Sequence, residues 1–476
     1  MEKRKLDSSK ISVIITLAIW NFVFLGTEYL FDNMMAYVAD AEDVVIAQSR
    51  ILGASVIGFF LYPLFRRQQK AGIKNILLFA ASFVSVICIF LIQQRISYQS
   101  IMIAGCLIFV LFGMAGGVIH KKAADLFAAD KNLAKAVGVS YALGLMLQFL
   151  NNNLVRWDVA EAIVLALFTA TGAILMIGFN GQENSGQAEE IQNHVAGRRK
   201  ITGKPEIAGV ILLVNVILMS CIFATLDNAV TLVHAEGSGD IGQWPRLLLA
   251  VSGLLAGVLF DLKGRRFMDI IMYCVTLLST ICAVVIELGG PFLAGLIVFY
   301  LSAGFFVVYF STGFVELADS MKLPEFWAGL GRTANNFCAV IIGHVSVAML
   351  ASGNSMMISV TALVLFALIS ITMFLYAGRV KTDLGLEKEE DQDAVKTDEN
   401  DIRKFTAFAE RFSLTEREQE VMKLLLTSDG NVQDLAGELF ISRAALYRHL
   451  TSLNEKTNTK SRIGLLQFYY GFKETD

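Results

Sequence analysis

The sequence predicts an all-α protein in which a polytopic membrane bundle of twelve helices is followed by a small soluble domain of four helices. Three observations lead to this prediction. The chain of 476 residues is 55% hydrophobic and only 17% charged, whereas soluble proteins carry about 25% charged residues. Twelve apolar runs approach the length of about 20 residues that a helix needs to cross a bilayer. From Val380 onward the composition becomes that of a water-soluble segment.

The twelve apolar runs fall into two groups of six. Between the groups lies a polar segment, residues 180–206, which is rich in Gly, Gln, Glu and Arg and is expected to be a cytosolic linker. The first run is too long for the apolar core of a signal peptide, so we expect it to remain as a membrane helix. The expected spans are 11–31, 44–64, 73–92, 101–119, 136–154, 161–179, 207–226, 245–261, 267–287, 291–311, 332–351 and 356–378.

The charges between the runs orient the bundle. With the amino terminus in the cytoplasm, the inner segments hold 22 Lys and Arg residues, and the outer loops hold only Arg95 and Arg156. This count sets aside Arg50, Arg246 and Arg332, which fall at helix edges or inside helices. Because positively charged loops stay on the cytoplasmic side, we predict a multi-pass protein with both termini in the cytoplasm.

A motif after the second run of the second group supports the six-plus-six organisation. Gly257 is followed by Asp261, Gly264, Arg265 and Arg266. This pattern resembles the loop motif G-x-x-x-D-x-x-G-R-R of the major facilitator superfamily. The glycines allow close helix packing, and the aspartate can pair with arginines across a cytoplasmic gate. The alternative is that these charges only anchor the bundle at the membrane face.

The first group of runs holds a partial copy of the same motif. Arg66 and Arg67 follow Gly58 at the distances found in the second copy, but Tyr62 and Phe65 replace the Asp and the Gly. Parallel repeats of this size are typical of the superfamily. The resemblance therefore implies a major facilitator-like fold for the membrane domain, residues 1–379.

An acidic segment follows the last apolar run. Residues 381–401 hold nine Asp and Glu side chains and show no apolar periodicity, so residues 380–412 are predicted to be a solvated cytosolic tether. Its last part, residues 401–412, has Phe405, Phe408 and Phe412 at helical spacing. A short helix is expected there.

Residues 413–473 have the pattern of four short helices. Ser413 or Thr415 can cap the first, Asn431 the second, Ser442 the third and Ser461 the fourth. Two short helices joined by a tight turn, the second with a polar face, form a helix-turn-helix.

The segment closely resembles the LuxR-type (GerE-like) DNA-binding domain over all four helices. It departs from the family where Ala445-Leu446-Tyr447 replaces the usual Thr-Val-Lys at the start of the recognition helix. The matching residues are Leu414, Thr415, Arg417, Glu418, Glu420, Val421, Leu435, Ala436, Leu439, Ile441, Ser442, Arg448, His449, Leu450, Lys456, Lys460, Ser461 and Arg462.

The resemblance implies that double-stranded DNA is a partner of this domain, and the charge distribution agrees. Basic residues outnumber acidic ones from the third helix onward, where phosphates would lie. The alternative is a solvated basic face. By resemblance, base edges would be contacted by Tyr447, Arg448 and Thr451. The rest of the expected DNA-binding set is Ser442, Arg443, Lys456, Lys460 and Arg462, of which the four basic residues would bind phosphates.

Three ionisable residues within the apolar runs are candidates for a ligand cavity. Glu28, Arg50 and His344 would be costly in hydrocarbon unless they line such a cavity. The alternative is that they lie at the membrane interface. A Glu28–Arg50 pair between the first two helices is one possible arrangement.

The sequence holds no signature of catalysis. It has no Ser/His/Asp or Cys/His constellation, no HExxH and no dinucleotide-binding glycine loop, so we expect neither an enzyme nor a cofactor. The cysteines lie in apolar runs without Cys-x-x-Cys spacing, which predicts neither disulfides nor a metal site. They are Cys88, Cys106, Cys221, Cys274, Cys282 and Cys338.

Two functions fit these features. The first is a one-component transcription regulator of the bacterial cytoplasmic membrane, whose bundle, embedded in lipid, senses an unknown small molecule and whose tail binds a promoter. The second is a secondary transporter with a regulatory tail. Because the DNA-binding family generally acts as dimers, a homodimer is expected to form on DNA through the fourth helix, around Ile463, Leu466 and Tyr470.

Overall fold

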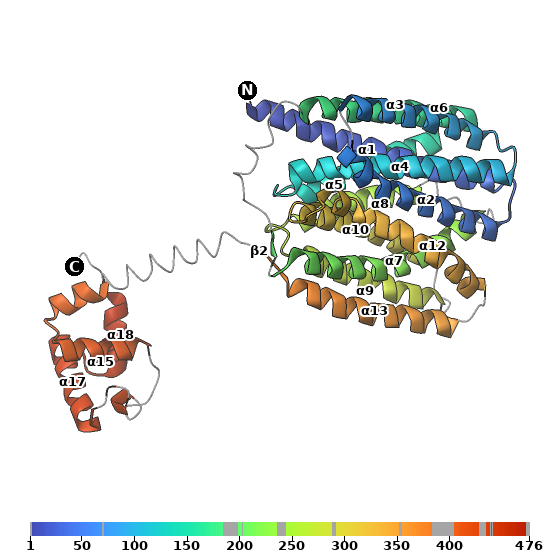
Figure 1. The fold of residues 1–476 in the computed structure, drawn as a ribbon. Coiled ribbons are helices and arrows are strands. Elements are labelled where there is room, and N and C mark those ends of the chain that lie inside the picture. The colour runs from blue at the N-terminus through green and yellow to red at the C-terminus, as the bar shows by residue number, and fades with distance from the viewer. Residues whose placement is uncertain are drawn as a thin grey trace. The chain divides into compact units, whose positions relative to one another are not determined.

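The computed structural model (Figure 1) separates into two compact units, Met1–Leu384 and Gly385–Asp476, each with its own hydrophobic core. The acidic tether, apart from its first and last residues, and most of the linker lie outside the described part of the chain. The structure describes residues 2–68, 71–155, 157–183, 199–201, 203–235, 244–287, 292–351, 355–382, 404–427, 435–437, 439 and 441–472.

The first unit is built from long helices. Each of the twelve expected spans lies inside one of these helices or extends beyond it by a single residue. The first six are α1 (Glu2–Met35), α2 (Ala41–Gln68), α3 (Ala71–Gln93), α4 (Tyr98–Phe127), α5 (Leu133–Leu154) and α6 (Asp158–Glu183). The second group is α7 (Pro205–Ala235), α8 (Trp244–Phe260), α9 (Met268–Glu287), α10 (Phe292–Ala318), α12 (Leu330–Ala351) and α13 (Ser355–Ala377), with the four-residue α11 (Pro324–Trp327) between α10 and α12.

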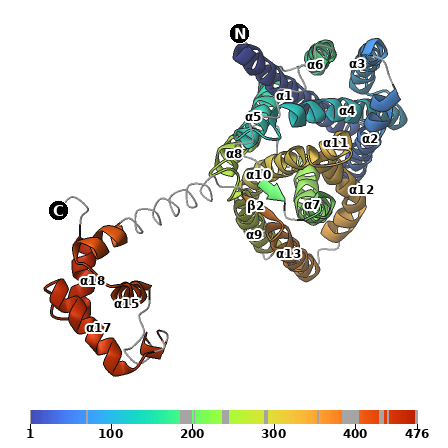
Figure 2. The same ribbon diagram turned by 60° about the vertical axis from the view of Figure 1, so that its left-hand side comes forward.

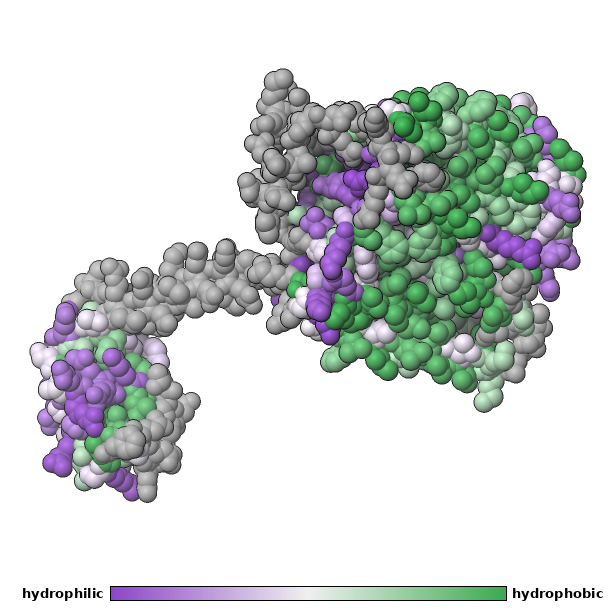
Figure 3. Space-filling view, in the orientation of Figure 1, coloured by the Kyte–Doolittle hydropathy of each residue, from purple (hydrophilic) through white to green (hydrophobic). Residues whose placement is uncertain are grey.

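Ten of the helices in the described residues are long and apolar enough to cross a membrane. The expected number of twelve spans is therefore not fully reached. In α8 only the shorter stretch Leu247–Phe260 is apolar, and α12 carries polar residues that lower its hydropathy, among them Arg332, Asn335 and Asn336. Apolar side chains cover the face of the bundle seen in Figure 3, and polar ones gather toward its ends.

The two groups of helices meet where α5 packs against α8 and α2 packs against α12. Figure 2 shows α3 and α6 at the edge of the bundle beside α1 and α4. Glycines let α5 and α8 approach closely. A Cβ atom on Gly138 would lie 2.5 Å from the carbonyl oxygen of Gly253, and one on Gly257 would lie 2.8 Å from that of Ala134. This contact gives Gly257 of the loop motif the packing role that its small size suggests.

Two short strands join the linker to the end of the membrane domain. The strands β1 (Arg199–Ile201) and β2 (Val380–Thr382) pair in antiparallel orientation, and Lys200 lies opposite Lys381. Ile201 and Val380 pack against the core of the bundle. No pattern in the sequence indicates this pairing, which joins the first residues of the tether to the linker.

The second unit is a small helical domain. Residues 404–411 are helical, as expected from the three phenylalanines, and α15 (Glu416–Thr427), α17 (Arg443–Lys456) and α18 (Arg462–Gly471) follow. Of the expected second helix only residues 435–437 are described as helical, with Leu435 and Ala436 buried. Together these elements enclose a core that does not depend on the membrane domain.

Candidate functional site

The recognition helix α17 has a buried side and an exposed side. Its N-cap is Ser442, whose hydroxyl accepts a hydrogen bond from the amide of Ala445 at 3.2 Å. Three leucines on the inner side join the domain core: Leu446, Leu450 and Leu453. The residues predicted to contact bases all lie exposed on the other side: Tyr447, Arg448 and Thr451.

Three of the basic residues predicted to bind phosphates lie near the start of α17 or near the start of α18. Arg443, in the first turn of α17, is exposed and its guanidinium lies 5.9 Å from the ring centre of Tyr447. Lys460 is exposed before α18, and Arg462 is half-buried at its start. The phosphate role of these side chains remains a prediction.

The fourth basic residue, Lys456, has an internal role. Its ammonium donates to a carboxylate oxygen of Glu418 at 2.7 Å and to the carbonyl of Ser413 at 2.8 Å. Glu418 also accepts hydrogen bonds from the Ser452 hydroxyl at 2.6 Å and from the Thr415 amide at 2.8 Å. Burial raises the pKa of Glu418, but these hydrogen bonds outweigh it and lower the pKa to about 2. Lys456 therefore ties α17 to the start of α15.

The fourth helix presents apolar side chains on the surface of the domain. Ser461 caps α18 by accepting a hydrogen bond from the Gly464 amide at 3.1 Å. Ile463 is 70% exposed and Tyr470 is 65% exposed, whereas Leu466 is half-buried. Exposed apolar side chains of this size are suited to pairing with a second copy.

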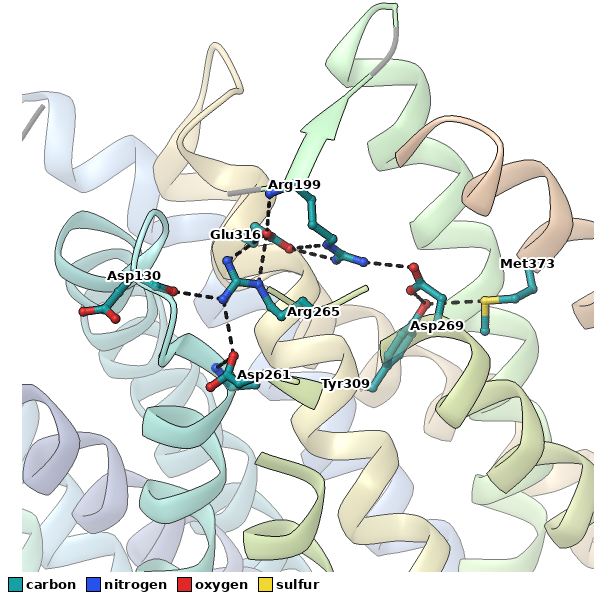
Figure 4. Close-up of polar contacts among 9 residues, drawn as sticks. Asp130, Arg199, Asp261, Arg265, Asp269, Tyr309, Glu316 and Met373 are labelled. Atoms are coloured by element: carbon teal, nitrogen blue, oxygen red, sulfur yellow. Dashed lines mark hydrogen bonds and ion pairs between the residues drawn. The ribbon is translucent and has the colours of Figure 1, made fainter. Parts of the chain in front are cut away.

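In the membrane domain, buried charged side chains form a network that we call the ion cluster: Arg199, Asp261, Arg265, Asp269 and Glu316 (Figure 4). Arg265, which is fully buried, donates to Glu316 from Nε at 3.1 Å and lies 3.3 Å from Asp261. Arg199 donates to Glu316 from Nε at 2.8 Å and to Asp269 from Nη1 at 2.9 Å. Glu316 of α10 thus bridges the two arginines.

The loop motif also fastens α8 to the start of α5. The carboxylate of Asp261 accepts hydrogen bonds from the amides of Ala134 at 3.1 Å and Lys135 at 2.7 Å, in the first turn of α5. Asn132, the N-cap residue of that helix, makes no side-chain capping bond. A carboxylate at a helix N-terminus is favoured by the free amides and by the helix dipole. Asp261 therefore caps a helix of the other half of the bundle.

The turn between α8 and α9 explains the last residues of the motif. Lys263, Gly264 and Arg265 all have left-handed backbone angles, with φ of 47°, 65° and 67°. Glycine adopts this conformation without strain, whereas the two flanking residues need surrounding contacts to hold them. The turn directs Arg265 into the ion cluster, while Arg266 lies exposed outside it.

A further buried cation, apart from the ion cluster, lies between the two halves of the bundle. Arg332 of α12 is 6% exposed, and no ion pair to it is found among the described residues. Its Nη2 lies 3.5 Å from the side-chain oxygen of Asn21, and its Nε has no hydrogen-bond partner. The guanidinium is instead surrounded by aromatic rings, whose centres lie 5.4–5.8 Å away, those of Trp20, Phe24 and Phe310.

A small cavity lies beside Asn21, the residue that Arg332 contacts, but Arg332 is not among its described lining residues. Its volume is about 10 Å³, and its polar lining includes Asn21, His120, Tyr141 and Ser311. About one water molecule fits in such a space. Arg332 and this cavity thus share Asn21 as a neighbour, and half of the cavity lining is apolar.

The three ligand candidates from the sequence do not gather at this position. Glu28 accepts a hydrogen bond from Gln48 at 3.0 Å, and Arg50 is exposed and donates to the hydroxyl of Tyr98 at 3.3 Å. The side chain of His344 lies outside the described part of the structure. Within that part, no group of three or more His, Cys, Asp and Glu side chains is arranged to hold a metal ion.

Three members of these networks had no signal in the sequence. Arg199 is one of several basic residues in the linker and looked like an ordinary cytoplasmic charge, and Asp269 looked like a first-turn acid of a helix. Tyr309 donates to Asp269 at 3.0 Å from within an apolar run. Contacts between distant segments leave no spacing pattern by which these residues stand out.

Comparison with known proteins agrees with this geometry. Residues 412–469 match the family of bacterial regulatory proteins described as the luxR family (GerE). Among solved structures, the human organic anion transporter MFSD10 (TETRAN) covers 79% of this chain and 99% of its own, with 13% identity and a TM-score of 0.50. The proton:xylose symporter XylE of the major facilitator superfamily covers 79% and 97%, with 13% identity and a TM-score of 0.55. No curated protein matches the chain.

The fold and the comparisons together define a multi-pass membrane protein with a small helical domain of the LuxR type on the same chain. Its membrane part has the major facilitator fold, and its carboxy-terminal part is a LuxR-type helix-turn-helix DNA-binding domain.

Proposed function

We propose that the protein is a one-component transcription regulator of the bacterial cytoplasmic membrane, in which the bundle senses a small molecule and the tail binds promoter DNA. The observation that carries this proposal is the position of Arg199. Its side chain belongs to the ion cluster, and its backbone belongs to β1, which pairs with β2. Because the tether begins at β2, a change in the bundle that moves Arg199 and β1 would reach the DNA-binding domain through β2 and the tether.

A sensor of this kind needs a part that can adopt two arrangements, with and without the ligand. In this proposal that part is the ion cluster. It joins α10, the α8–α9 turn and β1, and Asp261 extends it to α5 of the other half. A rearrangement that separates the halves at this end would break the bonds from Asp261 to α5 and from Arg265 to the carbonyl of Asp130. The cluster would then lose its anchor in the first half, and a shift of Arg265 and Glu316 would loosen the hold on Arg199 and β1. The DNA-binding domain would then gain a longer tether, which changes its ability to pair on an operator.

The sensed molecule is proposed to carry a negative charge and to bind at Arg332. No described carboxylate lies within ion-pair distance of the Arg332 guanidinium. A buried charge of this kind is costly in a membrane, and an anion would offset that cost. The cavity beside Asn21 is too small for an organic anion in this packing of the bundle. The ligand must therefore bind a more open packing of the bundle with higher affinity than it binds this one. Such a difference in affinity between two states is what any ligand-driven switch requires.

The alternative is a secondary transporter whose tail only regulates it. The major facilitator fold supports this function as well, since both solved relatives are named as transporters. Uptake or efflux that persists after deletion of residues 401–476 would favour the transporter, whereas a regulator needs its tail for every measurable output.

The decisive experiment is genome-wide mapping of the DNA bound in cells by the full-length chain, with Arg448→Ala as the matched variant. We expect discrete sites for the native protein that disappear in the variant at equal membrane abundance. If the two proteins give the same profile, the proposed function is wrong.

A further inference from the structure

A larger cavity lies in the first half of the bundle, away from Arg332 and the ion cluster. It has a volume of about 160 Å³ and is enclosed mainly by α1, α3, α4 and α6. In Figure 2, α3 and α6 lie at the edge of the bundle, beside α1 and α4. No step of the proposed regulation uses this cavity.

The walls of the cavity are apolar along most of its length. On α4 the lining runs from Leu111 to Asp125, which corresponds to about 20 Å along a helix axis. The lining hydroxyl of Ser85 donates to the carbonyl of Ala81, and that of Thr169 to the carbonyl of Leu165. Because both hydroxyls are satisfied within their own helices, this part of the cavity suits hydrocarbon. Large apolar lining residues are Trp20, Leu78, Phe112, Phe168, Met176 and Phe179.

One end of the cavity is strongly basic. Among its described lining residues are four cations from three helices, Arg66, Lys74, Lys121 and Lys122, and a single acid, Asp125. Asp125 is paired with Lys121. The lining therefore carries an excess of positive charge at one end of an apolar slot, at the face that the loop charges assign to the cytoplasm.

The cavity also opens toward the surrounding hydrocarbon. Leu77 lines it and is 39% exposed, and its neighbours on α3, Ile73 and Ile76, are 47% and 69% exposed. Exposed apolar side chains on a membrane-spanning helix face lipid. A molecule can therefore enter sideways from the bilayer without crossing the ion cluster.

We infer that this cavity binds an anionic phospholipid of the cytoplasmic leaflet. The phosphate lies among Arg66, Lys74 and Lys122, and an acyl chain occupies the apolar slot between the α3–α6 pair and the α1–α4 pair. Basic pockets between membrane helices on the cytoplasmic side are suited to such headgroups. A water-soluble anion would satisfy the basic end but leave the slot, about 20 Å long, without an occupant.

The test is native mass spectrometry of the full-length protein released from vesicles of equal phosphatidylglycerol and phosphatidylcholine. The native protein should retain phosphatidylglycerol in preference to phosphatidylcholine. Lys74→Gln/Lys122→Gln should lower this preference by about tenfold or more, since each cation near the surface contributes severalfold. The matched control is Lys131→Gln/Lys322→Gln, which removes two exposed charges outside the cavity and should leave the preference unchanged.

A second variant tests the slot while all four cations remain. Ala173 lines the cavity on α6, so Ala173→Phe should fill the slot and reduce lipid retention. The inference is overturned if the native protein shows no headgroup preference or if the control loses as much as the cavity variant. It is also overturned if Ala173→Phe retains the lipid fully, or if the protein retains dodecyl phosphate but no phospholipid.

Discussion

Arg199 and Glu316 lie 117 positions apart in the chain, yet they form a buried ion pair in which Nη2 lies 2.8 Å from Oε2. The pair joins the linker between the two helix groups to α10. Since Arg199 also starts the strand that pairs with β2, it is the one described residue that belongs both to the ion cluster and to the β1–β2 pair.

Arg199→Gln should therefore change the affinity of the full-length protein for its operator. Loss of the guanidinium leaves Glu316 with Arg265 alone and weakens the attachment of β1. We expect a change of about fivefold or more, the lower range of coupling between distant sites. Lys204→Gln, an exposed charge in the same linker, is the control. Equal affinities for the native protein and Arg199→Gln in a gel-shift titration would contradict this coupling.

Arg448→Ala should weaken specific binding of the fragment 401–476 to an operator by about 1–3 kcal/mol, the discrimination of one good base contact. Arg448 is exposed on the side of α17 opposite the buried leucines. Arg411→Ala removes an exposed charge from the helix 404–411 and should leave the affinity within about twofold. A comparable loss in both variants would show that Arg448 acts only through general charge.

Lys460→Ala should weaken binding to specific and nonspecific DNA alike. An exposed lysine that binds a phosphate releases one counterion, so the slope of log affinity against log salt should fall by about 1. Fluorescence anisotropy at several salt concentrations measures the slope. An unchanged slope would remove Lys460 from the DNA interface.

The isolated DNA-binding domain should lose stability in acid because of Glu418. Its pKa is about 2 in the folded domain, against 4.5 for the ordinary side chain. A carboxyl with a lowered pKa stabilises the fold above its unfolded pKa, and this stability is lost as the pH falls from about 4.5 toward 2. We expect about 2 kcal/mol of the free energy of unfolding to depend on this group. Urea unfolding at several pH values should show that dependence reduced in Glu418→Gln; an identical pH profile would exclude it.

Arg332→Gln should remove the response to the sensed molecule without destabilising the bundle. Among the described side chains the guanidinium has no acidic partner within ion-pair distance, so its neutral replacement relieves a cost of burial. The melting temperature of the purified variant should equal or exceed that of the native protein, while a promoter reporter loses its induction. A large drop in melting temperature would instead assign Arg332 a structural role.

Much of this fold could be predicted from the sequence because its signals are local. Apolar runs placed all twelve long helices, and the spacing from Gly257 to Arg265 identified a motif whose packing and ion pairs the structure contains. The cap at Ser442 and the leucine spacing fixed which side of α17 faces the core. These features depend on residues close together in the chain.

The parts that could not be predicted depend on pairing between distant segments. β1 and β2 are three residues each and lie about 180 positions apart, so neither has a strand signal of its own. Glu28 and Arg50 stand out in the sequence as ionisable residues within apolar runs, but this feature does not distinguish a residue that lines a cavity from one at a helix end. Arg332 is also an ionisable residue within an apolar run. Only the structure shows that it is buried among aromatic rings.

The most direct test of the coupling between bundle and DNA-binding domain is the operator affinity of reconstituted Arg199→Gln protein carrying Lys200→Cys and Lys381→Cys, with the native cysteines replaced by alanine. The two positions lie opposite each other in the β1–β2 register. We expect the reduced protein to show the altered affinity of Arg199→Gln, and the cross-linked protein to return to the affinity of the same cysteine pair with Arg199 intact. If cross-linking leaves the affinity unchanged, the β1–β2 pair does not connect the bundle to the DNA-binding domain.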